Sequence, residues 1–313
     1  MDFALALLLG YGLDLLLGDP AWLYHPVCLI GRYISFCEKS LRARGGNLRR
    51  SAIALTVSTV ILTMAAAALL PALLSPLGRV PRLAAMAILD WMGLAVKSLA
   101  QEARGVGRAL KEGGVSAGRR QVARIVGRDT QSLSGEEIVK ATVETVVENT
   151  TDGIISPMLF AFLGGPVLLW GFKAASTLDS MVGYLDPKYR DIGWSSARLD
   201  DVLNYLPARL TALLLCAAAP FCGLDAGNAL RIVLRDHKNH KSPNCAWSEA
   251  AAAGALHIQL GGTHAYFGKA VVKPTIGDAD RPAENADIER ACRLAITASG
   301  LMAALLALIR LIL

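Results

Sequence analysis

AIALTVSTVILTMAAAALLPALL, residues 52–74, decides the class of fold. These 23 residues contain no charged side chain, and about 20 apolar residues in a helix cross a hydrocarbon core about 30 Å thick. A second stretch of this kind, Leu294–Leu313, is interrupted only by Arg310 near its end, where a long side chain can reach the interface. The sequence therefore predicts an integral membrane protein.

The composition points the same way. Of 313 residues, 53% are hydrophobic and 19% are charged, and the mean hydropathy is +0.42, whereas soluble domains carry about 25% charged residues. The net charge of +6 is interpreted as positive loops on the cytoplasmic side, not as nucleic-acid binding. The six cysteines include no CxxC pair, so neither a zinc site nor a disulfide framework is indicated.

Further apolar segments extend the prediction to an all-α, polytopic membrane bundle with broken or re-entrant segments and cytoplasmic helical loops. Phe3–Leu17 lacks a basic start and a small-residue cleavage site, so we expect a retained short helix. The turn at 75–82 makes a hairpin of the spans at 52–74 and 83–99. We expect residues 1–313 to form a single membrane domain, with a cytoplasmic helical insert at about 101–152 and motif loops at about 18–51, 173–209 and 225–293.

Two apolar segments, Ile154–Phe172 and Leu210–Leu224, are predicted to enter the bilayer only partway. The first is broken by Gly164-Gly165-Pro166, and the second is short and contains Pro220. If both crossed fully, the polar segment 173–209 would lie across the bilayer from the other polar segments. One active site cannot be divided in this way, and irregular backbone is tolerated at membrane depth where protein or a polar cavity surrounds it.

An acidic stripe precedes the first of these segments, in VETVVENTTDGIISP (143–157). Glu144, Glu148 and Asp152 are spaced four residues apart, so on a helix they share one face. Carboxylate clusters suit Mg²⁺, although a solvated helical face is the simpler interpretation of an isolated triplet. The apolar residues on the opposite face and the membrane segment that follows favour a site.

Three other polar segments add cations. Arg128 lies ahead of a predicted capping box at Ser134 and Glu137, and its guanidinium suits phosphate. Lys173 and Asp179 follow the Gly-Gly-Pro break. The basic stretch 236–244 suits phosphate contact, with an anionic-lipid patch as the alternative. His237 and His240 within it lack a third soft ligand for a metal.

Together these motifs resemble the adenosylcobinamide-phosphate synthase family of cobalamin biosynthesis, in the right order over nearly the whole chain. The matching motifs are Asp14-xxx-Gly18-Asp19-Pro20 with His25-Pro26-Val27 and Ile30-Gly31; Arg128-Asp129-Thr130 with Glu144-xxx-Glu148-Asn149-xx-Asp152; Lys173-xxx-Thr177-x-Asp179-Ser180-Met181 with Ala197-Arg198-x-Asp200-Asp201; and His240-x-Ser242-Pro243-Asn244 with Glu249-Ala250-Ala251. Cys245 and Trp247 stand where the family pattern leads us to expect small residues.

The resemblance implies an ATP- and Mg²⁺-dependent ligase in the cytoplasmic (inner) membrane, with its active site facing the cytoplasm. Such an enzyme joins the amine of an aminoalkanol, or of its phosphate, to the free propionate of adenosylcobyric acid and yields adenosylcobinamide (phosphate). The expected partners are the corrinoid, the aminoalkanol and membrane lipids, with no nucleic acid. A homo-oligomer or a complex with other cobalamin-assembly enzymes stays open.

The residues suit this chemistry, and we assign hypothetical roles to them. The expected Mg²⁺ ligands are Glu144, Glu148, Asp152 and Asp179. The expected phosphate contacts are Arg128, Lys173 and Arg198. Either His25 or His240 is expected to accept the proton of the incoming amine. The remaining expected nucleotide-binding residues are Asn149, Lys241 and Asn244.

Other classes of protein fit the sequence less well than a ligase does. An intramembrane prenyltransferase also uses carboxylates and Mg²⁺, but paired Asp-rich motifs on two long spans are expected there, whereas these acids lie on broken segments and loops. A non-catalytic membrane sensor would tolerate loss of the acids, yet all four motifs are complete. A transporter is disfavoured because no inverted repeat is evident.

The partway insertion of the two broken segments predicts that Ser195 lies on the cytoplasmic side. A cysteine introduced at Ser195 should react with a membrane-impermeant thiol reagent only after the cytoplasmic face is opened. Modification from the outer face of intact cells would show that the segments cross fully.

Overall fold

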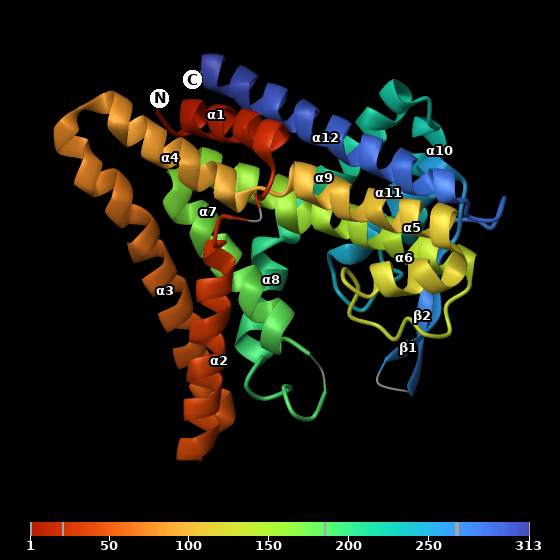
Figure 1. Cartoon of the computed structure of the whole chain (residues 1–313), viewed down its shortest axis with the longest axis horizontal. Coiled ribbons are helices and arrows are strands. Elements are labelled where there is room, and N and C mark those ends of the chain that lie inside the picture. The colour runs from red at the N-terminus through yellow and green to blue at the C-terminus, as the bar shows by residue number, and fades with distance from the viewer. Residues whose placement is uncertain (1, 21, 185, 267–268, 313) are drawn as a thin grey trace. The chain divides into compact units, whose positions relative to one another are not determined.

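The computed structural model describes residues 2–20, 22–184, 186–266 and 269–312, and helices dominate this part of the chain (Figure 1). The chain forms two compact units. Unit 1 comprises Met1–Ala95, Ser156–Asn204 and Ala303–Leu313, and unit 2 comprises Val96–Ile155 and Tyr205–Met302. This division into units does not test whether the chain forms a single membrane domain, which stays a prediction.

Unit 1 is built from helices that pack through small residues. Its helices are α1 (Asp2–Leu17), α2 (Pro26–Arg44), α3 (Leu48–Leu74), α4 (Arg79–Gly93), α7 (Ser156–Val182) and α8 (Trp194–Leu203). The short 3₁₀ turn Ser75–Leu77 joins α3 to α4, as expected for a hairpin. A Cβ atom at Gly10 of α1 would lie 2.8 Å from the backbone of both Ala87 and Trp91, so α1 and α4 approach backbone to backbone.

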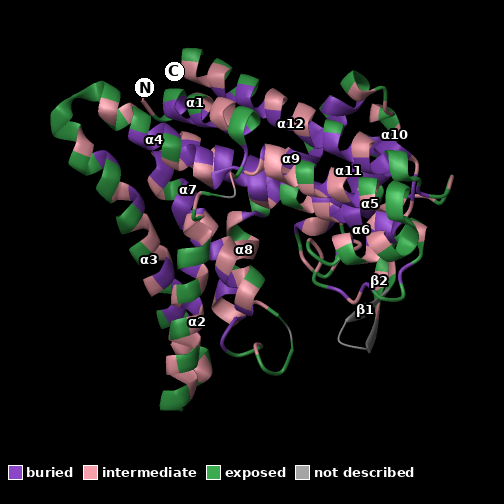
Figure 2. Cartoon of the chain, viewed as in Figure 1, coloured by how far each residue is buried: buried purple, intermediate pink, exposed green. Residues whose placement is uncertain are grey.

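Unit 2 contains the helices and the hairpin that carry most of the predicted site residues. They are α5 (Val96–Val122), α6 (Gly135–Thr150), the π-helical turn Thr151–Ile155, α9 (Tyr205–Ala218), the 3₁₀ turn Ala219–Cys222, α10 (Ala226–Asp236), α11 (Cys245–Leu256), β1 (Leu260–Tyr266), β2 (Lys269–Ile276) and α12 (Asn285–Ile312), whose last residues belong to unit 1. Helix α11 is buried over nearly its whole length (Figure 2), which its run of alanines permits.

Five helical runs among the described residues are long and apolar enough to cross a membrane. They are Leu48–Leu77, Arg79–Val122, Gly135–Val182, Tyr205–Cys222 and Asn285–Ile312. Only 22% of the apolar window in the first run is buried, against 61% in the third. Exposed residues recur along α3 (Figure 2), and they include the apolar Ile61 and Leu69. The prediction of an all-α polytopic membrane protein is confirmed.

Helix α5 loses helical geometry at Gly114, whose φ is 66°. Two local predictions are confirmed. The capping box is present, since Ser134 accepts from the backbone of Glu137 while Glu137 accepts from the backbone of Ser134. Helix α7 loses helical geometry at Gly164 and Gly165. Whether the broken segments enter the bilayer only partway stays a prediction.

The two-stranded sheet was not predicted. Strands β1 and β2 pair antiparallel, with an irregularity between Gly261 and Gly262, both of which have positive φ. The sequence contains the glycines that such a bulge requires, but β1 and β2 lie in a segment that was expected to be a helical loop.

The close approach of α1 and α4 predicts a position-specific effect of adding one methyl group. Gly10→Ala should destabilise the protein by about 1–3 kcal/mol, because the backbone of α4 would have to move to admit the new atom. Gly12→Ala is the matched control on the same helix, since nothing lies within 4 Å of its Cβ position. Thermal unfolding of both variants in detergent checks the expectation, and equal melting temperatures for the two would refute it.

Candidate active site

A buried ion pair lies at the centre of the site in unit 2. The guanidinium Nη2 of Arg128 donates to Glu144 Oε2 over 2.8 Å, with the two side chains 5% and 10% exposed. Arg128 enters from the loop ahead of the α6 capping box, and Glu144 projects from the middle of α6. The Nε atom of Arg128 is buried without a hydrogen-bond partner among the described residues. The guanidinium of Arg128 thus already has an anionic partner in Glu144. Its predicted contact with phosphate stays a prediction.

The second oxygen of Glu144 fixes the β-hairpin. The backbone N–H of Gly261 donates to Glu144 Oε1 over 2.8 Å. Gly261 has a φ of 75°, and a Cβ atom there would clash with the carbonyl of Pro274, so only glycine fits this position. The irregularity in β1 therefore aims a backbone donor at the carboxylate, a use of bulges seen next to active sites.

Helix α11 brings a third glutamate to the cluster. Glu249 is 5% exposed. Burial raises the pKa of Glu249 well above its usual range, and the nearby Glu144 and Glu148 raise it further, while Lys273 and Arg128 oppose the shift. Glu249 therefore holds its proton more tightly than an ordinary glutamate does.

Cys245, at the start of α11, lies beside the stripe of acids on α6. Its Sγ donates to Glu148 Oε1 over 3.3 Å. Burial and the neighbouring carboxylates of Glu148, Glu249 and Asp152 raise the pKa of the Cys245 thiol well above its ordinary value, so it stays a thiol and serves as a donor. The departure from the family pattern at this position thus provides a hydrogen bond to a predicted metal ligand.

The predicted stripe runs from α6 into a π-helical turn. Glu144 and Glu148 lie on α6, and Asp152 lies in the turn Thr151–Ile155, a kind of irregularity that is frequent at functional sites. Among the described residues no three His, Cys, Asp or Glu side chains converge closely enough to hold a metal ion. This does not exclude Mg²⁺ bound with a nucleotide, which needs one or two carboxylates together with substrate phosphates.

His240 lies near the same cluster, and its hydrogen bond limits its role. Nδ1 accepts from the backbone N–H of Ser242 over 3.0 Å. Burial lowers the pKa of His240 to about 4, and Lys273 adds to this. The ring is therefore neutral at pH 7 with its proton on Nε2. In that tautomer it donates from Nε2, which argues against the predicted role as a base.

Three further predicted residues lie in unit 2 in different settings. Asn244 is buried, where its Oδ1 accepts from Arg209 over 3.2 Å. Asn149 is exposed and donates to the carbonyl of Thr145, and Lys241 is exposed. Asn244 thus has a structural role at the start of α11, whereas Asn149 and Lys241 have side chains open to a ligand.

Four predicted residues belong to unit 1, and His25 is the most constrained. Its Nδ1 accepts from the N–H of Val27 over 3.2 Å and caps α2, while the ring also makes a hydrogen bond to the backbone of Met92. Burial lowers the pKa of His25, with Asp19 opposing and Lys173 reinforcing the shift. With both sides of the ring engaged, His25 is a poor candidate for the predicted base.

Lys173 and Asp179 lie on α7, and Arg198 is exposed on α8. The carboxylate of Asp179 occupies the place that a side chain at position 183 would need. The glycine at this position therefore leaves space for that carboxylate. Asp179 lies in unit 1, whereas the other three predicted metal ligands lie in unit 2. The metal-binding roles of all four stay predictions.

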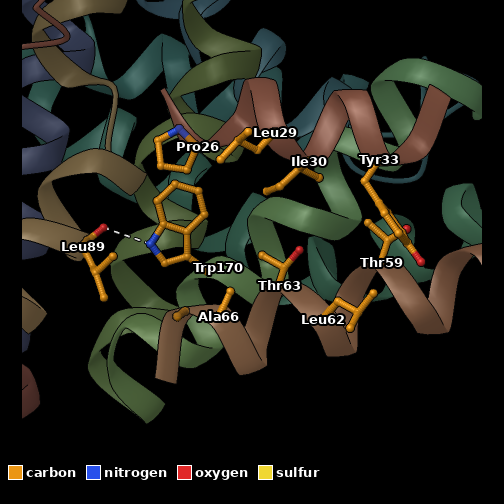
Figure 3. A pocket seen from close by; sticks show the side chains of 11 residues that line it. Pro26, Leu29, Ile30, Tyr33, Thr59, Leu62, Thr63, Ala66, Leu89 and Trp170 are labelled. Carbon is orange, nitrogen blue, oxygen red and sulfur yellow. Dashed lines mark hydrogen bonds between the residues drawn. The ribbon is translucent and has the colours of Figure 1, made fainter. Parts of the chain in front are cut away.

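Unit 1 also contains a small, largely apolar cavity (Figure 3). Its volume is about 310 Å³, and mostly apolar side chains of α2, α3, α4 and α7 line it, together with the hydroxyl groups of Tyr33, Thr59 and Thr63. Trp170 closes one side, with its Nε1 donating to the carbonyl of Leu89 over 3.0 Å and its ring centroid 6.3 Å from that of His25. Among the residues that the structure describes, no charged side chain lines this cavity, so it is not suited to nucleotide phosphates.

Four site residues were not assigned from the sequence: Cys245, Glu249, Gly261 and Lys273. Glu249 belonged to a recognised motif, and its place in an otherwise apolar helix was a signal that it is buried for a reason. Gly261 and Lys273 gave no such signal, because their roles depend on the hairpin.

The fold and the cluster together define a polytopic helical membrane protein with a buried ionic site. Residues 7–295 match the family model described as CobD/Cbib protein. The chain belongs to this family, and a role in cobalamin biosynthesis follows from that membership. No solved structure matches it.

Curated relatives are similar over most of their length. A protein of Geobacter metallireducens called cobalamin biosynthesis protein CobD is 50% identical over 273 residues, 86% of this chain and 85% of that protein. The cobalamin biosynthesis protein CbiB of Salmonella arizonae is 47% identical over 304 residues, 96% of this chain and 95% of that protein. A CobD protein of Listeria monocytogenes is 46% identical over 289 residues, 92% of each chain.

The buried ion pair predicts a rescue between two substitutions. Arg128→Met should destabilise the protein by about 3–5 kcal/mol, because Glu144 is left buried without its cation. Adding Glu144→Gln removes the stranded charge and keeps an acceptor for Gly261, so the double variant should regain most of the loss. Chemical unfolding in detergent measures both, and a double variant no more stable than Arg128→Met alone would contradict the pairing.

The pKa of His240 predicts a pH dependence of stability. The folded pKa of about 4 lies below the ordinary histidine value of 6.5, so between these values the unfolded chain binds more protons and the free energy of unfolding rises with pH. His240→Gln should flatten this rise, which amounts to at most about 3 kcal/mol. Denaturant unfolding at pH 4.5 and 7 is the measurement.

His257 provides a control of opposite sign. Its hydrogen bond with Asp280, reinforced by Asp225, raises the pKa of His257. It therefore stabilises the fold below its unfolded pKa and loses that effect as pH rises through its folded pKa. His257→Gln should leave intact the rise below about pH 6.5 that His240→Gln flattens, and it should remove a fall in the free energy of unfolding above that pH. Equal slopes in the two variants would contradict both assignments.

Proposed function

We propose that the protein is an ATP- and Mg²⁺-dependent ligase that forms the amide of adenosylcobinamide phosphate. Its substrates would be adenosylcobyric acid and an aminoalkanol, with aminopropanol O-phosphate favoured. The observation that carries the proposal is the cluster of Arg128, Glu144, Glu148 and Glu249, in which the motif acids and the motif arginine meet inside unit 2. Membership of a cobalamin biosynthesis family supports it.

The chemistry requires activation, because a carboxylate is a poor electrophile. A propionate oxygen of the corrinoid would attack the γ-phosphorus of ATP, so that ADP leaves and an acyl phosphate forms. The amine nitrogen would then attack the acyl carbon, the bond to the phosphate oxygen would break, and inorganic phosphate would leave. The proton lost by the amine nitrogen passes to solvent, since neither His25 nor His240 has a lone pair free to take it.

The residues of unit 2 would divide into positioning and binding groups. Arg128 and the N–H of Gly261 hold the Glu144 carboxylate in one orientation. Glu148 and Asp152 are the carboxylates that would hold Mg²⁺, which when bound neutralises phosphate charge during phosphoryl transfer. The Nε2–H of His240 and the exposed ammonium of Lys241 would donate to phosphate oxygens.

We further propose that the site faces the cytoplasm, where ATP is present. The basic residues of α2 and of the start of α3, including Arg42, Arg44, Arg49 and Arg50, support this orientation. The substrates, the metal and a location in the inner membrane belong to the same proposal.

ATP hydrolysis by the purified protein in detergent tests the proposal. Mg²⁺, adenosylcobyric acid and aminopropanol phosphate are added singly and together, and mass spectrometry follows the amide product. We expect ADP to form only when both substrates are present, in the same molar amount as the amide product. Folded protein that makes no amide under these conditions would refute the ligase.

Glu148→Gln tests the assigned metal ligand in the same assay. Turnover should fall by at least about 10- to 100-fold, as is typical when support for a bound metal is removed, and the Mg²⁺ concentration at half-maximal rate should rise. Glu112→Gln is the matched control, since Glu112 is exposed on α5. Unchanged turnover of Glu148→Gln across Mg²⁺ concentrations would remove Glu148 from the site without refuting the ligase.

A further inference from the structure

A second polar groove lies in unit 2, between α5 and the first turns of α12. Its volume is about 490 Å³, and its polar lining consists of Gln101, Arg104, Arg108, Lys111, Asn285 and Glu289. None of these residues belongs to the motifs assigned to the ligase site. The groove therefore needs an explanation of its own.

The floor of the groove is held by two fixed contacts. Arg104 forms a bidentate ion pair with Glu289, in which Nε donates to Oε2 over 2.7 Å and Nη2 donates to Oε1 over 3.0 Å. Asn285 Nδ2 donates to the carbonyl of Gly107 over 3.0 Å. A Cβ atom at Gly107 would lie only 3.2 Å from Asn285 Oδ1, so the absence of a side chain there lets α12 approach α5.

Charge in the groove is not balanced. The single carboxylate, Glu289, is already shared between Arg104 and Arg293. Arg108 and Lys111 are exposed about one and two turns after Arg104 on α5, and within the described part of the chain neither has an ion pair or a hydrogen bond. Two cations with no counter-charge, beside the amide groups of Gln101 and Asn285, match an anion with several acceptor oxygens.

The place of the groove along the helices indicates the source of that anion. Helix α12 is one of the runs able to span a membrane, and its charged first turns give way to an uncharged stretch from Leu294 to Ile309. The groove therefore lies at the polar end of a spanning helix, where phospholipid headgroups are found. Clusters of Lys and Arg beside a span favour anionic lipids.

We propose that Arg108 and Lys111 bind a phosphate group in this groove, and that its source is the headgroup of an anionic phospholipid. The lipid would tie α5 and the start of α12 to the bilayer surface. This site is independent of the proposed ligase activity, because none of its residues contributes to the cluster around Glu144. A soluble phosphate is the other source of the same chemistry, and the experiment separates the two.

Binding is measured on the full chain in a neutral detergent by native mass spectrometry, with titrations of dioctanoyl-phosphatidylglycerol, dioctanoyl-phosphatidylcholine and inorganic phosphate. Arg108→Gln/Lys111→Gln should weaken phosphatidylglycerol binding by about tenfold or more, given the contribution of each basic side chain at a membrane surface. The matched control, Arg44→Gln/Arg120→Gln, removes the same charge from exposed positions outside the groove and should change binding by less than about threefold on the same scale. Unchanged circular dichroism and melting temperature confirm that both variants fold.

Each outcome decides the proposal. Preferential binding of phosphatidylglycerol over phosphatidylcholine that depends on Arg108 and Lys111 supports a lipid headgroup. Binding of inorganic phosphate with the same dependence, without a preference for phosphatidylglycerol, supports the groove but assigns it to a soluble phosphate. If neither ligand loses affinity in the groove variant, or if the control variant loses as much, the proposal is overturned.

Discussion

The buried pair of Arg128 and Glu144 is the contact on which the site in unit 2 depends. Removing two charges from water is costly, and attraction alone often fails to repay that cost. Here the carboxylate also accepts the N–H of Gly261, so one side chain joins a loop, a helix and a hairpin. A pair of this kind contributes little net stability, but it permits few alternative arrangements of the three segments that it connects.

Three glutamates can share this space because their environments differ. Glu144 faces a cation and a backbone donor, Glu148 faces the thiol of Cys245, and burial together with the neighbouring glutamates raises the pKa of Glu249 well above its usual range. Environments that separate the protonation states of like groups are a usual feature of acid–base sites. The raised pKa of Glu249 favours its protonated form more than in an ordinary glutamate.

Patterns that depend on neighbouring residues could be predicted from the sequence, and contacts between distant segments could not. The span at 52–74, the capping box at Ser134 and the break at Gly164 each follow from local chemistry, and each is present. The pairing of Arg128 with Glu144 joins residues 16 positions apart, and that of Glu144 with Gly261 joins residues 117 apart. The hairpin was missed because its glycines serve a tertiary contact, and the bond from Ser242 that occupies His240 Nδ1 depends on a turn that composition does not specify.

The order in which the chain visits the two units limits how the molecule can be taken apart. Unit 1 is assembled from three separate stretches, the last of them Ala303–Leu313, and unit 2 from the two stretches between them. No single cut therefore releases either unit intact. A fragment that stops before Ala303 contains all of unit 2 but leaves unit 1 incomplete, so a ribosome must finish α12 before the earlier helices of unit 1 have all their partners.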